Sequence, residues 1–384
     1  MVKFNVVHLT HTYIPSDSRI LKELNIISDL PNASVIGVGV LDRRATDGEA
    51  EIKNIKSIKL ISRNFTILPS VLRRILSYFE FLFKQLFVVI NERPAIIHCH
   101  DTPSLPVAIF SKFFFNASVI YDAHELESQK NSQGSMISTV TLLIEKLAWR
   151  HIDHFITVSG SILRWYERSF SKKPSSIILN SPEIGKDFTS RNNDTINLRE
   201  FFNIENKKFI FLYLGMLIPG RGISSIISAF SDPKVSSHVV FVGDGPLKID
   251  VDSASVANPN IHYHPPVPHD EVISIASSAD VGICLIENIS LSDFYSLPNK
   301  LFEYAFADIY VIASDFPDMA SVVNEYGLGL VSDCSSASIV EAVLKVEQNG
   351  IYRSSKCLKG LSWSSQAAKL KILYEDIIRK HGKK

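Results

Sequence analysis

The segment Leu297-Pro298-Asn299-Lys300-Leu301-Phe302-Glu303-Tyr304, followed by Val311-Ile312-Ala313-Ser314-Asp315, combines the start of a helix with a strand. Proline suits the first turn of a helix, and a β-branched run that ends in a carboxylate is typical of a buried strand. Short apolar runs and longer helical patterns alternate in this way nearly throughout the chain. Such alternation predicts parallel sheets with crossover helices on both faces.

The start of this predicted helix has the chemistry of a nucleotide-sugar site. The first N–H groups of a helix are unpaired and carry a partial positive charge, which suits a diphosphate. Glu303 follows Lys300 by three residues and Asn299 by four, so the three side chains share about one helix face. The carboxylate can accept hydrogen bonds from paired sugar hydroxyls, while Lys300 and the backbone amides hold the phosphates.

The length of 384 residues favours two domains. The polar stretch 183–208 has the composition of a linker, so we expect domains at 1–182 and 209–364, with a final helix in 365–384. Predicted strands lie at 4–9, 35–40, 57–61, 95–99, 118–122, 154–158, 176–179, 209–214, 239–242, 261–263, 281–286, 310–314 and 328–331. Predicted helices lie at 18–29, 69–91, 104–113, 135–151, 223–230, 301–306 and 367–379.

The composition excludes several classes of protein. Formal net charge is zero, so no global field recruits nucleic acid. The four cysteines are scattered without a C-x-x-C pair, which favours a reducing compartment over a disulfide scaffold or a metal site. Because the N-terminus lacks the basic-then-apolar order of a signal peptide, we expect a cytoplasmic protein.

A second phosphate-binding element is predicted at 213–223, where a strand meets a glycine-rich turn and a helix start. Gly215 and Gly222 let the backbone approach a ligand, and Arg221 offers a forked donor for phosphate oxygens. The alternative is an ordinary strand–helix connection with a solvated arginine. Gly243-Asp244-Gly245 closes another strand and is typical of a tight turn. Pro266 lies in a proline-rich loop that could form a wall for a nucleobase.

Two strands of the first half end in histidines. These are Ile97-His98-Cys99-His100-Asp101 and Val119-Ile120-Tyr121-Asp122-Ala123-His124-Glu125. His98, His100, His124 and Glu125 could be metal ligands, but a zinc-enzyme pattern such as H-E-x-x-H is absent. We favour hydrogen bonding to sugar hydroxyls or to the reacting centre, with His124 as the main candidate.

The loop after the first strand contains Ser16-Asp17-Ser18-Arg19. Ser16 or Asp17 can cap the helix that follows. Capping does not explain Arg19, which could reach toward a phosphate or an acidic acceptor. We therefore expect Asp17 and Arg19 among the catalytic residues, together with His124.

The predicted helix 69–91 mixes basic and aromatic residues, and Phe113-Phe114-Phe115 follows it beside Lys112. That mixture is typical of docking at an anionic membrane surface. Its apolar residues lie nearly all round the helix, however, which suits a buried helix equally well. Both interpretations remain open from the sequence.

These motifs together resemble the family 4 (group 1) retaining glycosyltransferases of bacterial polysaccharide and lipopolysaccharide synthesis. Their fold is the α/β GT-B arrangement, two Rossmann-like doubly wound domains facing an interdomain cleft. The resemblance covers nearly the whole chain. It rests on 215–222, Asp17-Ser18-Arg19, Tyr121 to Glu125, Gly243-Asp244-Gly245 and Pro298 to Tyr304.

The resemblance implies roles for several residues. Arg221 matches the family's phosphate-binding basic residue, and Glu303 matches the second glutamate of an E-x7-E pattern, which binds the ribose. Tyr295 stands at the first glutamate, and Met216 replaces an arginine often found after Gly215. The residues implied for donor binding are Gly215, Arg221, Gly222, Pro298, Asn299, Lys300 and Glu303, with Tyr295, Ser296, Leu297 and Pro266 as contacts for the sugar or base.

By the same resemblance, His124 contacts the donor sugar near the reacting carbon, and the closing helix from Ala367 packs on the first domain. The implied activity is transfer of a hexose-type sugar from a nucleoside-diphosphate sugar to a glycan or lipid-linked acceptor, with retention and without a metal or cofactor. The setting would be the cytoplasm or the cytoplasmic face of the inner membrane. Alternatives are a nucleotide-sugar 2-epimerase and a non-catalytic binding subunit.

Overall fold

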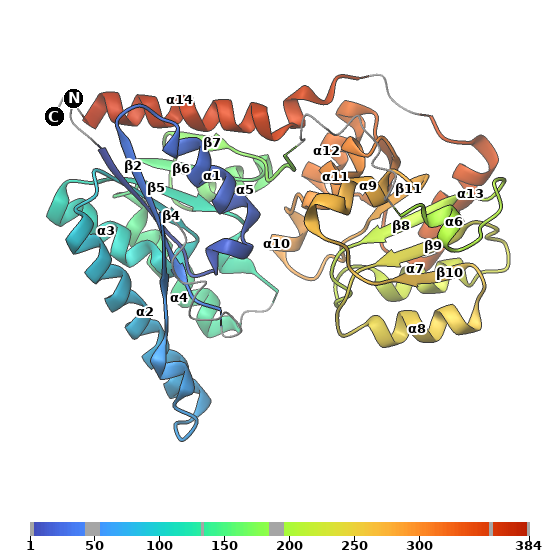
Figure 1. Cartoon of the computed structure of the whole chain (residues 1–384), viewed down its shortest axis with the longest axis horizontal. Helices are drawn as coiled ribbons and strands as arrows, with labels where there is room; N and C mark the ends of the chain where they lie inside the picture. Colours follow the sequence, from blue (N-terminus) through green and yellow to red (C-terminus); the bar gives the residue numbers. More distant parts are fainter. Residues whose placement is uncertain (1–3, 43–53, 132–133, 184–195, 353–355, 382–384) are drawn as a thin grey trace. The chain divides into compact units, whose positions relative to one another are not determined.

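The computed structural model describes residues 4–42, 54–131, 134–183, 196–352 and 356–381 (Figure 1). The chain divides into two compact units. The first comprises Met1–Leu179 with Gln366–Lys384, and the second comprises Asn180–Ser365. Each unit is built around one parallel sheet, in agreement with the predicted fold class.

The sheet of the first unit has the order β3-β2-β1-β4-β5-β6-β7, with every neighbouring pair parallel. Its strands are β1 (Phe4–Leu9), β2 (Ala33–Val40), β3 (Ile55–Ile58), β4 (Ile96–His100), β5 (Ser118–Ala123), β6 (His154–Thr157) and β7 (Ser175–Ile177). The central strands are almost wholly buried, because helices cover both faces of a parallel sheet.

The helices of the first unit lie on both sides of this sheet. They are α1 (Ser18–Ser28), α2 (Ser70–Glu92), α3 (Leu105–Phe115), α4 (Ser135–Trp149), α5 (Gly160–Ser169) and α14 (Trp363–His381). Because the crossovers are right-handed, the direction in which the chain moves along the sheet decides which face a connection covers. The connections β3-to-β4, β4-to-β5 and β5-to-β6 therefore lie on one face of the sheet, and the β1-to-β2 connection lies on the other. Figure 1 accordingly shows α2, α3 and α4 on one side, with α1 and α14 on the opposite side.

None of the helices in the described ranges is both long enough and apolar enough to span a bilayer.

The second unit repeats the same topology, with the sheet order β10-β9-β8-β11-β12-β13. Its strands are β8 (Ile210–Leu214), β9 (His238–Val242), β10 (Ile261–His264), β11 (Val281–Cys284), β12 (Tyr310–Ser314) and β13 (Gly329–Ser332). Its helices are α6 (Leu198–Phe201), α7 (Ile223–Phe230), α8 (Lys248–Ala257), α9 (Val272–Ala276), α10 (Leu291–Phe294), α11 (Asn299–Phe306), α12 (Pro317–Tyr326) and α13 (Ser336–Asn349).

Helix α11 is fixed to the centre of the second sheet by Tyr304. The Tyr304 hydroxyl accepts a hydrogen bond of 2.9 Å from the Leu214 N–H at the end of β8. It also donates to the Leu212 carbonyl oxygen at 3.1 Å. The tyrosine ring occupies the space above Gly282, where a Cβ atom would lie 2.3 Å from it. Glycine on β11 therefore lets α11 seat directly against the strands.

Several element boundaries differ from the sequence-based expectation. The strand expected at 57–61 is β3 at Ile55–Ile58, and Ile61 begins a short 3-10 helix instead. Helices α5, α8, α9, α10, α12 and α13 were not predicted. Helix α8 buries only Val251, so its apolar periodicity is too weak to register in the sequence.

The division between the two units falls at Leu179 and Asn180, just before the stretch 183–208 that was expected to be a linker. Residues 184–195 lie outside the described ranges. Helix α6, which follows them, already belongs to the second unit. Leu198 is buried there, and the Arg199 guanidinium lies 2.8 Å from the Asp280 carboxylate. At the other end of the chain, residues from Gln366 onward belong to the first unit.

Candidate functional site

In the second unit the candidate residues surround the carboxyl ends of β8 and β11. The strand order reverses between these two neighbours, and such a switch point is the usual ligand position in an open α/β sheet. Gly215 follows β8 with φ of 128°, and Gly222 precedes α7 with φ of 70°. Gly222 offers no side-chain cap to α7. The first N–H groups of α7 are therefore not satisfied by a side chain of the N-cap residue.

The turn Gly243-Asp244-Gly245 supports this loop from behind. A Cβ atom on Gly243 would lie 1.9 Å from the Gly215 carbonyl oxygen, and one on Gly245 would lie 2.4 Å from that of Leu217. The Leu217 N–H also donates to the Asp244 carbonyl oxygen at 2.8 Å. The two glycines thus permit close backbone packing, as expected of a tight turn.

Lys300 folds back from α11 onto the end of β8. Its Nζ atom lies 3.9 Å from the centroid of the Tyr213 ring and 3.8 Å from the position a Cβ atom would take on Gly215. Helix α11 begins after Pro298, which provides no side-chain cap. The amino-terminal turn of α11 and the Lys300 ammonium therefore adjoin the glycine-rich loop.

Arg221, Lys300 and Glu303 all act electrostatically on one thiol, that of Cys284 at the end of β11. Burial raises the pKa of Cys284 to about 12, while Lys300 and Arg221 oppose the rise and Glu303 adds to it. Arg221, Lys300 and Glu303 are therefore all within electrostatic range of Cys284. The Arg221 guanidinium also lies 3.6 Å from Asp293 in α10.

The other predicted donor contacts lie around this group. Asn299 is exposed at the start of α11, Leu297 is buried and Pro266 is exposed after β10. Tyr295 closes α10, and the Ser296 hydroxyl donates to the Asp293 carbonyl oxygen at 2.7 Å. Ser296 thus stabilises the turn that leads into α11.

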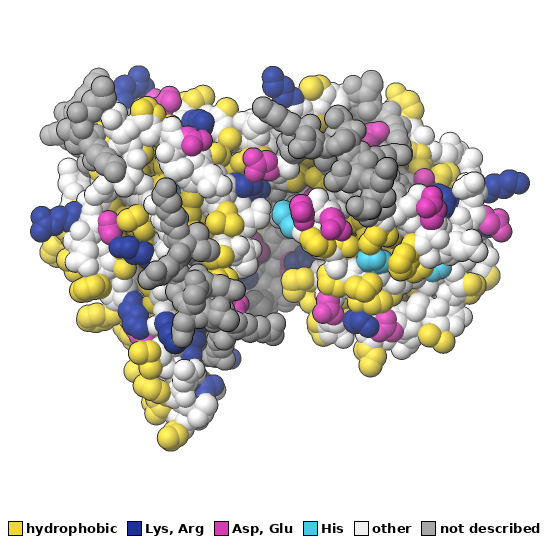
Figure 2. Space-filling view, in the orientation of Figure 1, with side chains coloured by type: hydrophobic (Ala, Val, Ile, Leu, Met, Phe, Trp, Pro, Cys, Tyr) yellow, Lys and Arg dark blue, Asp and Glu magenta, His cyan; other side chains and the backbone are white. Residues whose placement is uncertain are grey.

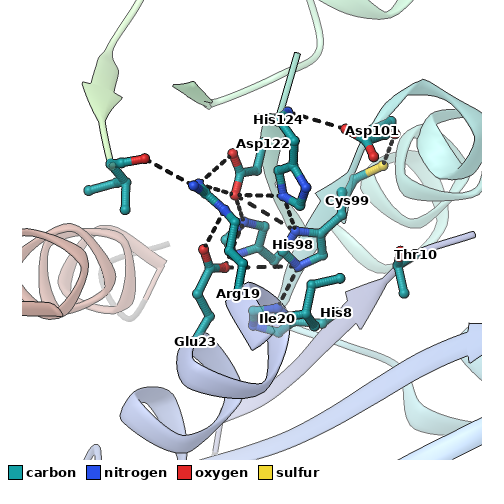
Figure 3. A network of polar contacts seen from close by, with 12 residues as sticks. His8, Thr10, Arg19, Ile20, Glu23, His98, Cys99, Asp101, Asp122 and His124 are labelled. Carbon is teal, nitrogen blue, oxygen red and sulfur yellow. Dashed lines mark hydrogen bonds and ion pairs between the residues drawn. The ribbon is translucent and has the colours of Figure 1, made fainter. Parts of the chain in front are cut away.

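In the first unit the candidate residues form a buried polar network that includes Arg19, Asp122 and His124 (Figure 3). The Arg19 guanidinium donates to both oxygens of Asp122, at 3.0 and 2.8 Å, and to the Ile178 carbonyl oxygen at 3.0 Å. Asp122 also contacts His124, whose Nε2 atom lies 3.4 Å from Asp122 Oδ2. Among the described residues, His124 Nδ1 has no hydrogen-bond partner.

Three further histidines and a tyrosine continue the network. His124 Nε2 lies 3.2 Å from His100 Nδ1, and His100 Nε2 lies 2.9 Å from His8 Nδ1. The Tyr374 hydroxyl, from α14, lies 3.1 Å from His8 Nε2 and 2.8 Å from His98 Nδ1. These side chains come from β1, β4, β5 and α14, and they bind the closing helix to the sheet.

The charges in this network are set by burial and by two carboxylates. Burial disfavours the cationic form of His124. The Asp101 and Asp122 carboxylates outweigh the effect of burial and raise the pKa of His124 to about 9. Burial would raise the pKa of Asp122, yet Arg19 and His124 hold it well below its usual range. Burial lowers the pKa of His8 and His100 well below the usual value. At neutral pH His124 is therefore the imidazolium, and its Nδ1–H is available as a donor.

Asp101 positions the backbone beside His124. Its φ of 58° is uncommon for a residue other than glycine, and its carboxylate accepts a 3.2 Å hydrogen bond from the His124 N–H. Backbone strain of this kind tends to collect at functional sites. This supports His124 as a functional residue.

The contacts of the Asp17 and Arg19 side chains differ from those that direct catalytic roles would require. Asp17 Oδ1 accepts a 3.2 Å hydrogen bond from the Ile20 N–H, and Oδ2 accepts from the Thr12 hydroxyl at 3.1 Å. Asp17 is thus the N-cap of α1. The Arg19 side chain is only 2% exposed, so it orients Asp122 behind His124 and does not reach a ligand directly.

Two groups of side chains in the described ranges have the spacing of metal ligands. One is His8, Glu23, His98 and His100, and the other is His100, Asp122 and His124. Arg19 already lies 3.1 Å from Glu23 and 2.8 Å from Asp122. Its guanidinium therefore pairs with one carboxylate of each group. Glu125, the other ligand considered, is 57% exposed and pairs with Lys130.

Sequence reasoning missed several participants. Glu287 accepts a 3.1 Å hydrogen bond from the Gly222 N–H, and Asp293 pairs with Arg221. In the first unit, Glu23 and Tyr374 were not singled out. Glu287 carries a usable signal, since it follows the apolar strand run 281–286 directly. Glu23 and Tyr374 carry none, because each lies on a helix where a polar residue is ordinary.

Comparison with known proteins finds a family model that matches part of the chain. Residues 194–357 match the family model described as Glycosyl transferases group 1. No curated protein sequence matches the chain.

Three solved structures have similar folds. Sucrose-phosphate synthase from Thermosynechococcus elongatus is 16% identical, with 98% of this chain and 100% of that one covered and a TM-score of 0.74. Anabaena HepE in complex with UDP-glucose is 12% identical, with 97% and 100% covered and a TM-score of 0.72. UDP-GlcNAc 2-epimerase from Methanocaldococcus jannaschii is 11% identical, with 97% and 100% covered and a TM-score of 0.59. The chain therefore has the GT-B fold, and residues 194–357 are similar to the group 1 glycosyltransferase domain.

Proposed function

We propose that the protein is a retaining glycosyltransferase of family 4, which moves a hexose-type sugar from a nucleoside-diphosphate sugar to a hydroxyl group. The acceptor is a glycan or a lipid-linked glycan of a bacterial surface polysaccharide. The reaction takes place in the cytoplasm or at the cytoplasmic face of the membrane, without a metal ion or cofactor.

The observation that carries this proposal is the glycine-rich loop between β8 and α7, which contains Arg221 and lies against Lys300 of α11 at the switch point of the sheet. Two cations and two helix starts without side-chain caps suit a diphosphate. Glu303 belongs to the same helix as Lys300 and can accept hydrogen bonds from a ribose. The domain that contains them matches the group 1 glycosyltransferases. UDP-glucose is bound by HepE, a protein of similar fold.

The proposed chemistry needs no nucleophile from the protein. As the glycosidic bond breaks, negative charge develops on the leaving diphosphate, and Arg221, Lys300 and the helix N–H groups stabilise that charge. The acceptor hydroxyl attacks from the side of the leaving group, and a phosphate oxygen takes its proton. We propose that the His124 imidazolium donates from Nδ1 to a hydroxyl of the donor sugar.

Donor binding is tested by thermal stabilisation of the full chain with UDP-, GDP- and dTDP-sugars, because a ligand that binds only the native state raises the melting temperature. Lys300→Met should weaken binding of the best ligand by about tenfold to a hundredfold, the value of one charge-assisted hydrogen bond. Lys345→Met is the matched control, since Lys345 lies on the surface of α13 and pairs with Glu341. If Lys300→Met and Lys345→Met bind the nucleotide sugar with equal affinity, the proposed donor site is contradicted.

Stereochemistry is tested by proton NMR of the first product formed with the identified donor. An anomeric configuration equal to that of the donor is expected, and an inverted product would contradict the mechanism.

The 2-epimerase alternative is favoured by one observation, the similarity to UDP-GlcNAc 2-epimerase at a TM-score of 0.59. Incubation of the donor without any acceptor distinguishes the two activities. An epimerase would convert the donor to the nucleotide sugar inverted at C2 at full rate, whereas a transferase would leave the donor intact apart from slow hydrolysis. Binding without turnover of any kind would instead indicate a non-catalytic subunit.

A further inference from the structure

A chain of hydrogen bonds runs inward from His124 and passes through a tyrosine of the closing helix α14. His124 Nε2 lies 3.2 Å from His100 Nδ1, and His100 Nε2 lies 2.9 Å from His8 Nδ1. The Tyr374 hydroxyl follows, 3.1 Å from His8 Nε2, and it also lies 2.8 Å from His98 Nδ1. The three inner histidines and the tyrosine are fully buried. Their polar atoms must therefore satisfy one another.

The contacts of this chain depend on one another, because each of them holds one proton. A neutral imidazole has one N–H donor and one nitrogen that accepts. A ring that accepts a hydrogen bond from one neighbour must therefore donate to the next neighbour in the same direction. The chain has two possible directions, from His124 toward Tyr374 or the reverse. The direction decides whether His124 Nε2 donates or accepts.

A buried carboxylate selects the direction. Asp122 Oδ2 lies 3.4 Å from His124 Nε2 at one end of the chain and 3.5 Å from His98 Nε2 at the other (Figure 3). Because a carboxylate only accepts hydrogen bonds, both nitrogens carry a proton. The proton on His98 Nε2 leaves Nδ1 of that ring to accept from the Tyr374 hydroxyl, and His124 Nε2–H donates to His100. Both ends thus give the same direction, from His124 toward Tyr374.

The charges that set this direction lie inside the first unit. Lysine, arginine, aspartate and glutamate side chains are spread over the described surface in the space-filling view (Figure 2). Arg19, Glu23 and Asp122 are instead at most 2% exposed. Buried charges are screened much less than exposed ones, so the Asp122 carboxylate acts strongly on the neighbouring N–H groups.

We propose that Tyr374 is a positioning residue of the transferase site, whose hydroxyl fixes the direction of the chain and through it the orientation of the His124 ring. The hydroxyl accepts from His8 and donates to His98, so the protons of His8 and His100 stay on Nε2. His100 Nδ1 then accepts from His124 Nε2, which leaves the Nδ1–H of His124 for a hydroxyl of the donor sugar. This role in catalysis rests on the proposed function, whereas the direction of the chain does not.

Removal of the tyrosine hydroxyl would reverse the chain. In Tyr374→Phe the Nε2–H of His8 loses its acceptor, and a buried donor without a partner is costly. His8 restores a hydrogen bond by carrying its proton on Nδ1 and donating to His100 Nε2. His100 then carries its proton on Nδ1, directly against the Nε2–H of His124. The His124 ring must turn away or lose that proton, and either change misdirects or weakens its donor.

The histidines of the chain also belong to a group with the spacing of metal ligands. Within that group, His8 Nδ1 and His100 Nε2 are 2.9 Å apart, which is a hydrogen-bond distance. The Glu23 carboxylate of the same group lies 3.1 Å from the Arg19 guanidinium. A chain of hydrogen bonds accounts for these contacts. Bound metal is therefore an outcome that the test must be able to detect.

The direction of the chain is tested by long-range proton–nitrogen NMR of the full chain with isotope-labelled histidines, which distinguishes Nδ1–H from Nε2–H rings. Signals are assigned by contacts with neighbouring residues and by their loss in His8→Gln and His100→Gln. In the wild type both rings should be protonated on Nε2. In Tyr374→Phe the proton of His8 should move to Nδ1. This measurement needs no substrate, so it is independent of the proposed function.

The catalytic role is tested with the nucleotide sugar that thermal stabilisation identifies, by the rate at which the sugar is transferred or hydrolysed. Tyr374→Phe should lower kcat/KM about tenfold, the rate equivalent of one buried hydrogen bond. In a His124→Gln background the same substitution should cause no further loss, because the tyrosine acts only through His124. A merely structural role would give the same loss in both backgrounds.

The matched control is Tyr166→Phe. Tyr166 is a fully buried tyrosine of the first unit, and its hydroxyl donates to Glu145, outside the chain. Both tyrosine variants should lower the melting temperature, since each removes a buried hydrogen bond. Only Tyr374→Phe should change the histidine tautomers and kcat/KM.

Four results would overturn the proposal. A wild-type His8 or His100 protonated on Nδ1 would show that the direction is wrong. Unchanged tautomers and an unchanged kcat/KM in Tyr374→Phe would show that the hydroxyl positions nothing. Stoichiometric metal in the purified protein, by elemental analysis, would replace the chain with a metal site. A wild type that turns over no nucleotide sugar would refute the proposed function and the catalytic role of Tyr374 with it, while the tautomers would still decide the direction of the chain.

Discussion

Replacement of Asp101 by asparagine should lower the pKa of His124. Asparagine retains an oxygen that can accept the His124 N–H, and it tolerates the positive φ of position 101. The substitution therefore removes a negative charge with little change in geometry. Because the Asp101 carboxylate is the largest of the influences that raise the pKa of His124, the imidazolium should become much less stable.

The magnitude follows from the pKa itself. An ordinary histidine titrates near 6.5, and His124 titrates at about 9 in the folded chain. At about 1.4 kcal/mol per pKa unit, the fold favours the cation by about 3 kcal/mol. An opposite charge at this range contributes about one to three pKa units. The pKa of His124 in the variant should therefore fall by at least about one unit.

The assay is an NMR titration of isotope-labelled histidine side chains, with the His124 signal assigned by its loss in His124→Gln. Asp252→Asn, on the surface of α8 in the second unit, is the control and should leave the His124 titration unchanged. A wild-type His124 that titrates at or below pH 6.5 would refute the reasoning. So would a His124 pKa that is the same in wild type and Asp101→Asn.

The raised pKa also predicts a pH dependence of stability. Stabilisation by the His124 cation is complete below about pH 6.5 and is lost as the pH rises through about 9. Between pH 6.5 and 8 the loss should be about 1.5 kcal/mol relative to His124→Gln. Above pH 8 Lys173 opposes the effect, because burial lowers its pKa to about 8. Denaturant unfolding of the first unit within that window should show the difference.

Three further changes test the second unit. Asp293→Asn should tighten nucleotide-sugar binding up to about fivefold by calorimetry, because it frees Arg221 from an ion pair worth at most about 1 kcal/mol. Gly282→Ala should destabilise the unit by about 1–3 kcal/mol or more, since the new Cβ atom meets the Tyr304 ring; Gly134→Ala, which meets no atom within 4 Å, is its control in thermal melts. Tyr304→Phe should cost about 1–3 kcal/mol in the same melts, because a buried N–H loses its partner.

Much of the fold could be predicted because its signals are local. The strand at 4–9 and the helix at 18–29 appear in the structure at Phe4–Leu9 and Ser18–Ser28, since an apolar run or a helical period reflects the burial of that same segment. Helix α13 was missed although it buries Ile339 and Val343. Its serine-rich start weakened the periodic pattern.

The candidate donor site could also be predicted in large part. Parallel strands joined by right-handed crossovers bring their carboxyl ends to one edge of the sheet, so Arg221 and Lys300 were expected near each other. The partners of Arg221 could not be predicted in this way. Asp293 reaches it from a short helix whose position depends on the packing of α10, and no sequence period encodes that contact.

The sequence by itself therefore determined the two parallel sheets and the basic edge of the second one, because these depend on short-range patterns and on one topological rule. Only the tertiary structure decided the environment of Arg19, whose partner Asp122 lies 103 residues away on another strand. It also decided which side of α2 faces outward. The sequence of a helix that is apolar on two sides does not show which side packs on the sheet. In the structure, Phe81 and Val89 are the apolar residues of α2 that are buried.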